Sequence, residues 1–236
     1  MAYWITHIMI ADQITAYDQS IDKEGFCIGS IAPDCNIESP DWLTYDPPRE
    51  RTHFMNGKSK TTANYDEFYN QYIANKRFSS NHEKAFLLGY YAHLITDVEY
   101  TKFLRDEKRV KQMYERLRSD NKLKDKLIGK PETFDTIKIC FGKEMVLKDI
   151  VRTEQKYLTK KPNSLYNTVL RKTTVFPDYL DFLPHRAIAR KIPIMAKQIS
   201  EICNACMLFF TEDEYMSFVD KTADLIYQKM IYEGSI

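Results

Sequence analysis

The stretch from residue 81 to residue 106 constrains the fold more than any other part of the chain. It contains the nearly unbroken apolar run AFLLGYYAHLITD, in which His93 and Asp97 stand out as strongly polar residues. Its apolar side chains recur at three- and four-residue steps, the period of an α-helix, and the run is longer than an ordinary strand. A helix that is apolar almost all round is buried. We therefore expect 81–106 to be the central and most buried helix, with a capping signal at Asn81.

The rest of the chain also follows a helical period. Only 7 glycines occur among 236 residues, and strands that alternate at period 2 are hard to find. This pattern predicts an all-α protein of about seven to nine helices. The further segments with helical spacing are 3–17, 64–76, 107–128 as a charged helical pair, 133–158, 163–175, 185–210 and 212–232. Three prolines within 34–52 prevent a long helix there and predict an ordered loop.

Composition limits the number of domains and the kinds of partner. A chain of 236 residues with 44% hydrophobic content is long enough for one sizeable core, so we expect a single multi-helix domain over 1–236. The 34 Lys and Arg residues nearly balance the 33 Asp and Glu residues. The chain therefore has no overall field that would draw nucleic acid or an anionic membrane toward it.

The sequence favours a cytoplasmic location. Its start, MAYWITHIMIADQ, has no basic segment before an apolar run, and no uncharged stretch approaches the roughly 20 residues that span a bilayer. The five cysteines are odd in number and irregularly spaced, which fits free thiols in a reducing compartment better than a disulfide framework.

His93 and Asp97 are one helical turn apart. Their Cβ atoms are therefore expected about 5–6 Å from each other, close enough for an imidazole nitrogen and a carboxylate oxygen to bind one ion of the size of zinc. A buried His hydrogen-bonded to an Asp is the simpler explanation of an isolated pair of this kind. The apolar flanks favour further partners, because two polar groups in such a helix must be compensated.

Three other metal-favoured residues lie in short, distinctive phrases. His7 lies within WITHIMIA, on the face of the 3–17 helix that we expect to turn toward the core. Asp34 ends the apolar segment GFCIGSIAPD, and His53 lies in ERTHF. These side chains are the candidates for joining His93 and Asp97.

The segment FLLGYYAHLITD resembles the central helix of the zinc-dependent phospholipase C superfamily, which also includes single-strand-specific nucleases. The resemblance extends to the helix bearing His7, the IGSIAPD segment and the THF segment, which precede the HxxxD helix in that order. A closer resemblance is to compact, cytoplasmic bacterial proteins of this superfamily. They share the IAPD segment, the loop from Asp41-Trp42 to Pro47-Pro48, and a stretch like FPDYLDFLP at 176–184.

The resemblance implies an all-α bundle with a metal site. Asp34, His53, His93 and Asp97 would surround one metal, and Asp97 would also face a second metal held by His7. One or two zinc ions are implied, with iron or manganese as possible substitutes. The implied activity is hydrolysis of a phosphoester by a metal-activated water, and the implied substrate is a small phosphoester or a lipid-like molecule. By analogy, Asp34 would bind metal and steer or deprotonate that water.

Aromatic residues near these phrases could bind the substrate. Trp4, Trp42, Phe54 and Tyr100 could line a pocket for an acyl chain, a choline-like head group or a base. Packing in the core is the simpler expectation, because the chain has 16 Tyr and 13 Phe residues.

The sequence also departs from the pattern of the family. It contains no HxxxE pair, and Phe103 stands where a further His would contribute to the third zinc site, so we expect that site to be absent. Secreted members use the amino group of an N-terminal Trp as a ligand, whereas Trp4 lies inside this chain. These departures keep open the alternative that the protein is a non-catalytic, metal-binding helical scaffold or binding protein of the same superfamily. A hydrolase of the HD type needs adjacent His and Asp residues, which are lacking here. His185 could be a replacement ligand or a surface residue at a helix start.

Overall fold

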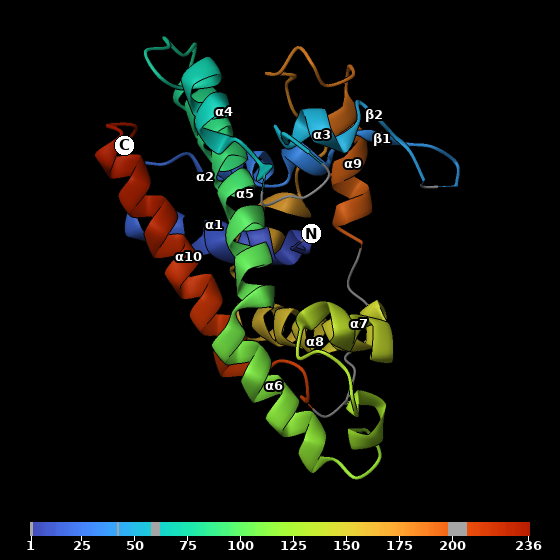
Figure 1. Cartoon of the computed structure of the whole chain (residues 1–236). Coiled ribbons are helices and arrows are strands. Elements are labelled where there is room, and N and C mark those ends of the chain that lie inside the picture. Colours follow the sequence, from blue (N-terminus) through green and yellow to red (C-terminus); the bar gives the residue numbers. More distant parts are fainter. Residues whose placement is uncertain (1, 42, 58–61, 198–206) are drawn as a thin grey trace.

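The computed structural model describes residues 2–41, 43–57, 62–197 and 207–236. The protein is mostly helical, as predicted, and the described residues form ten α-helices, more than expected (Figure 1). The helices are α1 (Trp4–Tyr17), α2 (Lys23–Gly29), α3 (Arg49–Thr52), α4 (Tyr65–Tyr72), α5 (Asn81–Arg105), α6 (Glu107–Ser119), α7 (Phe134–Phe141), α8 (Lys143–Lys160), α9 (Ala187–Met195) and α10 (Glu212–Tyr232). Shorter helical turns are η1 (Ala32–Asp34), η3 (Lys124–Leu127) and η4 (Tyr166–Leu170).

Helix α5 is the central helix, as its sequence predicts. It runs through the middle of the molecule, with α10 along one side and α1 crossing it (Figure 1). Its N-cap is Ser80 rather than Asn81, because the Ser80 side chain accepts a hydrogen bond from the Glu83 N–H. The Asn81 amide instead donates to the carbonyl oxygen of Ser20. The predicted helices at 3–17 and 212–232 are also present.

Helix α2 packs closely against α5 because glycines face each other across the interface. A Cβ atom at Gly89 would collide with the carbonyl oxygen of Phe26 and lie 2.9 Å from the Ser30 nitrogen. A Cβ atom at Gly29 would collide in the same way with the carbonyl oxygen of Phe86. The glycines thus let the end of α2, and the η1 turn after it, lie directly against the polar residues of α5.

The second half of the chain is more broken than its sequence pattern predicts. The expected helix at 133–158 is two helices, α7 and α8, separated by Gly142 with φ +81°. The expected helical pair at 107–128 is one helix, α6, followed by the short turn η3. The expected helix at 163–175 is reduced to the single π-helical turn η4.

The helices predicted at 185–210 and 64–76 are also shorter in the structure. The described part of the expected helix at 185–210 contains α9, residues 207–210 are not helical, and 198–206 lie outside the described residues. The helix predicted at 64–76 is shorter, because α4 ends at Tyr72.

The segment 34–52 is not a plain loop. It contains an antiparallel pair of short strands, β1 (Ile37–Glu38) and β2 (Tyr45–Asp46), in which Ile37 pairs with Asp46 and Glu38 with Tyr45. Helix α3 follows directly. The Glu38 carboxylate lies 2.8 Å from Arg190 Nη2 and 2.7 Å from the buried Lys191 Nζ of α9. These ion pairs fasten the strands to the helix beside them.

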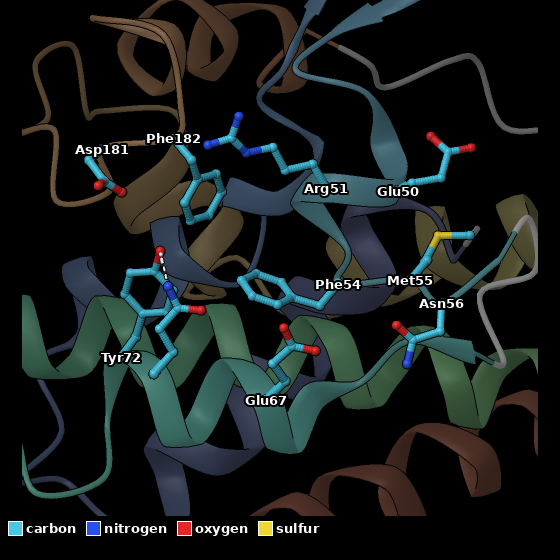
Figure 2. A pocket seen from close by; sticks show the side chains of 10 residues that line it. Glu50, Arg51, Phe54, Met55, Asn56, Glu67, Tyr72, Asp181 and Phe182 are labelled. Atoms are coloured by element: carbon cyan, nitrogen blue, oxygen red, sulfur yellow. Dashed lines mark hydrogen bonds between the residues drawn. The ribbon is translucent and has the colours of Figure 1, made fainter.

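A cluster of aromatic rings joins α3 and α4 to the segment around residue 182. The Phe54 ring centroid lies 6.2 Å from that of Tyr72 and 6.0 Å from that of Phe182. These rings line an open pocket of about 350 Å³, which Arg51 and Glu67 also border (Figure 2). The pocket is separate from the buried histidines described below.

The described helices pack around one cluster of buried apolar side chains that includes residues of α1, α2, α5, α8 and α10. Among the described helices, none is both long and apolar enough to cross a bilayer. A single domain over 1–236 stays a prediction.

Candidate metal centre

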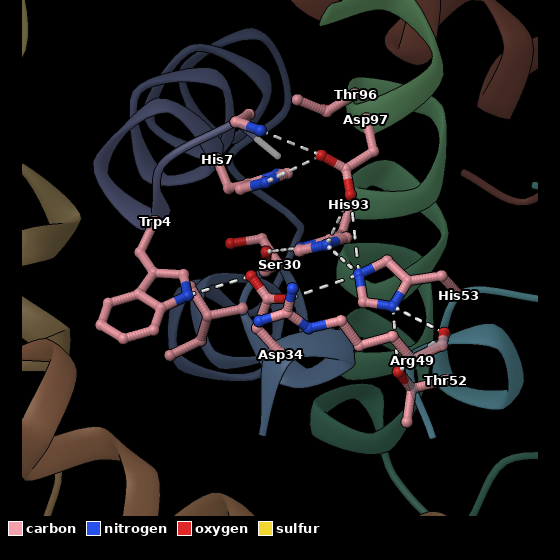
Figure 3. Close-up of polar contacts among 12 residues, drawn as sticks. Trp4, His7, Ser30, Asp34, Arg49, Thr52, His53, His93, Thr96 and Asp97 are labelled. Atoms are coloured by element: carbon pink, nitrogen blue, oxygen red, sulfur yellow. Dashed lines mark hydrogen bonds and ion pairs between the residues drawn. The ribbon is translucent and has the colours of Figure 1, made fainter. Parts of the chain in front are cut away.

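Five polar side chains from four parts of the chain converge inside the molecule (Figure 3). They are His7 of α1, Asp34 at the end of η1, His53 directly after α3, and His93 and Asp97 of α5. The most exposed of them, Asp34, is only 5% accessible to solvent. The structure thus brings together the five metal-favoured residues His7, Asp34, His53, His93 and Asp97.

Backbone contacts fix the orientation of two imidazole rings. His93 Nδ1 lies 2.8 Å from the carbonyl oxygen of Ser30, and His53 Nδ1 lies 3.1 Å from that of Arg49. A carbonyl oxygen can only accept a hydrogen bond, so these two contacts call for a proton on Nδ1; His53 Nδ1 also lies 2.9 Å from the Thr52 hydroxyl, which then acts as an acceptor. The Nε2 atom of each ring is left with a lone pair, which is the form that binds a metal.

The two Nε2 atoms lie side by side, with one carboxylate near His53 and the other near both rings. His53 Nε2 lies 3.3 Å from His93 Nε2 and 3.3 Å from Asp34 Oδ1. Asp97 Oδ2 lies 3.5 Å from His93 Nε2 and 3.6 Å from His53 Nε2. In these states the four atoms are all acceptors, and either a bound metal cation or an added proton on an imidazole would compensate them.

The spacing of Asp34, His53 and His93 fits a zinc ion, and Asp97 lies close to the two imidazoles as a fourth member of this first group. Zinc bound at about 2.0–2.1 Å by tetrahedral nitrogen and oxygen ligands places those ligands about 3.3–3.4 Å apart. The contacts along His93, His53 and Asp34 match this value, and those to Asp97 are slightly longer. The arrangement could therefore hold one divalent ion with little movement.

His7, His93 and Asp97 form a second group with suitable spacing. The His7 ring stacks on the His93 ring with centroids 3.8 Å apart, and His7 Nε2 lies 3.8 Å from Asp97 Oδ1. However, Asp97 Oδ1 already accepts a hydrogen bond from the Ala2 N–H at 3.1 Å. The first group is therefore the better-formed site.

Trp4 has a contact that its sequence position did not reveal. Its indole N–H donates to Asp34 Oδ2 over 3.0 Å, which turns Asp34 Oδ1 toward His53 (Figure 3). The sequence placed Trp4 among possible substrate-binding residues, and that role stays a prediction. The structure shows a side chain that positions a candidate ligand.

The other proposed substrate-binding residues do not gather around the cluster in the same way. Tyr100 is 1% exposed and packs in the core against Phe218, which argues against contact with a substrate. Phe54 follows His53 in the chain but lines the separate pocket of Figure 2. Trp42 lies outside the described residues.

His185 is not part of the centre. Its side chain is 85% exposed, and its Nδ1 lies 2.7 Å from Asp178 Oδ2. Asp178 also accepts a hydrogen bond from the Arg186 N–H just before α9. His185 is therefore a surface residue and not a replacement ligand of this centre.

Two features of the centre were missed in the sequence. One is the Ser30 carbonyl, which cannot be recognised from residue type because any residue has one. The other is Arg49, whose carbonyl contacts His53 and whose side chain points toward Asp34 in Figure 3. Its position four residues before His53 is a helical spacing that could have suggested this neighbourhood.

Residues 6–99 match the model of the family described as zinc dependent phospholipase C. The match covers less than half of the chain, but it includes all five residues of the cluster. No curated protein and no solved structure showed significant similarity to the chain.

Proposed function

We propose that this protein is a zinc-dependent phosphoester hydrolase, similar to phospholipase C, that acts on a small phosphoester or lipid-like substrate. The observation that carries the proposal is the convergence of two Nε2 lone pairs with two buried carboxylates. The family match over 6–99 supports zinc and phosphoester chemistry. We propose one zinc ion at the first group and a second only if His7 takes part. Iron or manganese is possible instead.

The proposed chemistry divides between the ion and the chain. A zinc ion with an open position lowers the pKa of bound water to about 7 and polarises a phosphoryl oxygen. His53, His93 and Asp97 would hold the ion, and their backbone and side-chain contacts preset their orientation. Asp34, turned by the Trp4 indole, would bind through Oδ1 and could accept a proton from the attacking water.

We propose the cytoplasm as the place of action. The three cysteines among the described residues, Cys27, Cys35 and Cys140, are free thiols. Free thiols persist in a reducing compartment.

The burial of the cluster also favours a second candidate function. Its five side chains are at most 5% exposed and come from separate elements, as in a metal site that holds a fold together. The protein could then be a metal-binding scaffold without turnover.

Metal analysis and a substrate screen test both candidates. Metal per chain is measured by mass spectrometry on wild type, His93→Ala and Asp97→Ala, with the surface variant His185→Ala as the matched control. The same proteins are assayed on chromogenic phosphodiesters and phosphomonoesters. We expect bound zinc and turnover in wild type and His185→Ala, and loss of both in the other variants. Bound zinc without turnover on any phosphoester would favour the scaffold, and a folded wild type that takes up no metal would overturn both candidates.

A further inference from the structure

Arg49 carries a guanidinium group that has no polar partner within the described part of the chain. Its Nε atom is buried from solvent and makes no hydrogen bond. The guanidinium carbon lies 3.9 Å from the centroid of the Tyr45 ring, so the planar group is held against an aromatic face. A cation that is ordered by stacking and has unused donors is suited to bind an anion.

Arg49 is tied to the metal-binding group through its own backbone. Its carbonyl oxygen accepts the hydrogen bond from His53 Nδ1, and its side chain extends from α3 toward Asp34 (Figure 3). The neighbouring Arg51 points elsewhere, because it borders the pocket of Figure 2 and lies 6.0 Å from the Phe182 ring. Of these two arginines on α3, Arg49 is the one whose side chain points toward the centre.

The charges around the centre favour an anionic ligand at Arg49. Two carboxylates, Asp34 and Asp97, balance the charge of one divalent ion, so that group alone offers no net positive charge to a phosphate. Among the described residues, no ion pair within 4.0 Å neutralises Arg49. Its charge is therefore available to a bound anion, and its planar fork matches two phosphoryl oxygens.

We propose that Arg49 binds the phosphoryl group of the substrate and that its N–H groups donate hydrogen bonds to the non-bridging phosphoryl oxygens. Tyr45 holds the guanidinium plane in place for this contact. This inference rests on the proposed function, because it assigns the recognition of the phosphoryl group at the same centre. It also predicts that the centre binds free inorganic phosphate.

Phosphate binding to the metal-loaded full chain tests the inference without relying on turnover. Binding of inorganic phosphate is measured by titration calorimetry on wild type, Arg49→Ala, Arg49→Lys and the matched control Arg51→Ala. We expect Arg49→Ala to weaken binding about tenfold or more and Arg51→Ala to leave it unchanged. Arg49→Lys should bind with intermediate affinity, because an ammonium keeps the charge but lacks the fork. Equal affinity in wild type and Arg49→Ala, or no phosphate binding by metal-loaded wild type, would overturn the inference.

Kinetics separate this inference from the proposed function. If wild type hydrolyses a phosphoester, Arg49→Ala should lower kcat/KM about tenfold or more while metal content stays at the wild-type level. Turnover that is unaffected by Arg49→Ala would overturn the role of Arg49 and leave the hydrolase proposal standing. Loss of phosphate binding in Arg49→Ala, in a protein that hydrolyses nothing, would support the anion site and contradict the hydrolase proposal. Circular dichroism and metal content confirm that each variant is folded and loaded.

Discussion

His93 Nδ1 donates to the backbone carbonyl oxygen of Ser30 over 2.8 Å, and this contact links the metal-binding group to the packing of α2 on α5. Ser30 follows directly after α2, and His93 lies four residues after Gly89, where the backbone of α2 lies against α5. The orientation of His93 therefore depends on how near the two helices lie. Ligand geometry and core packing are thus coupled in this protein.

Removing the metal should lower the stability of the fold. An ion that binds only the folded state adds about 2.7 kcal/mol to the free energy of unfolding when it is present at 100 times its Kd. Thermal unfolding is followed with and without a chelator in wild type and in His185→Ala, and both should show the same fall in Tm. His93→Ala should show a lower Tm and no response to the chelator. An unchanged Tm of chelated wild type would contradict a metal bound at this centre.

Gly89→Ala should destabilise the protein and weaken metal binding. The new Cβ atom would collide with the carbonyl oxygen of Phe26, so α2 must shift away from α5. Overpacking of this kind costs about 1–3 kcal/mol, whereas the gain in helix propensity is about 1 kcal/mol, so the net loss of stability should be up to about 2 kcal/mol. Urea unfolding midpoints and zinc affinity measure the two effects.

Gly57→Ala is the control, because its Cβ atom would lie 3.7 Å from Thr62 Oγ1, an ordinary contact. If Gly89→Ala bound zinc as tightly as wild type, the position of α2 would not be what places Ser30 for its contact with His93.

The sequence predicts the first half of the structure better than the second. The buried character of 81–106 and the helical spacing of His93 and Asp97 are local signals, and both are present in the structure. The inward position of His7 also follows from helical spacing. In the second half, the break at Gly142 comes from a glycine with φ +81° that ends α7, a local signal that hydrophobic periodicity alone passes over. The reduction of 163–175 to one turn depends on tertiary packing that periodicity does not encode.

The candidate site, too, could be predicted only in part from the sequence. Helical spacing pairs His93 with Asp97, and the resemblance of short phrases to the zinc-dependent phospholipase C pattern implies His7, Asp34 and His53 as their partners. Contacts made by backbone atoms, such as that of Ser30, carry no signal of residue type. The indole contact between Trp4 and Asp34 joins residues 30 positions apart, and no local pattern predicts it.

Trp4→Phe should weaken zinc binding without unfolding the protein. Phenylalanine keeps an aromatic ring but loses the N–H that holds Asp34 Oδ2. Loss of a hydrogen bond that orients a metal ligand typically lowers metal affinity by about 10–100-fold. Competition with a zinc-binding dye measures this affinity. Tyr17→Phe is the control, because it removes a hydrogen bond from the other end of α1, where Tyr17 donates to Asp224. Equal zinc affinity in wild type and Trp4→Phe would show that Asp34 does not need the indole.

Glu154 should make stability depend on pH. Its carboxylate is buried between α8 and α1, where the Thr6 hydroxyl donates to it and lies 2.5 Å from the Tyr215 hydroxyl. Burial raises the pKa of Glu154 from 4.5 to about 8, although the hydrogen bond from Thr6 acts in the opposite direction. The folded protein therefore keeps this proton up to about pH 8, whereas the unfolded chain loses it near pH 4.5.

Between these two values the folded state binds more protons than the unfolded state, so the free energy of unfolding should fall as pH rises from about 4.5 to about 8. Glu154→Gln mimics the protonated side chain and removes this dependence. Relative to wild type, the variant should gain stability across the window, by a total on the order of a few kcal/mol. Urea unfolding at several pH values measures the difference, with the exposed Glu144→Gln on the same helix as the control. A difference between wild type and Glu154→Gln that stays constant from pH 5 to about pH 8 would show that Glu154 does not hold its proton in the folded state.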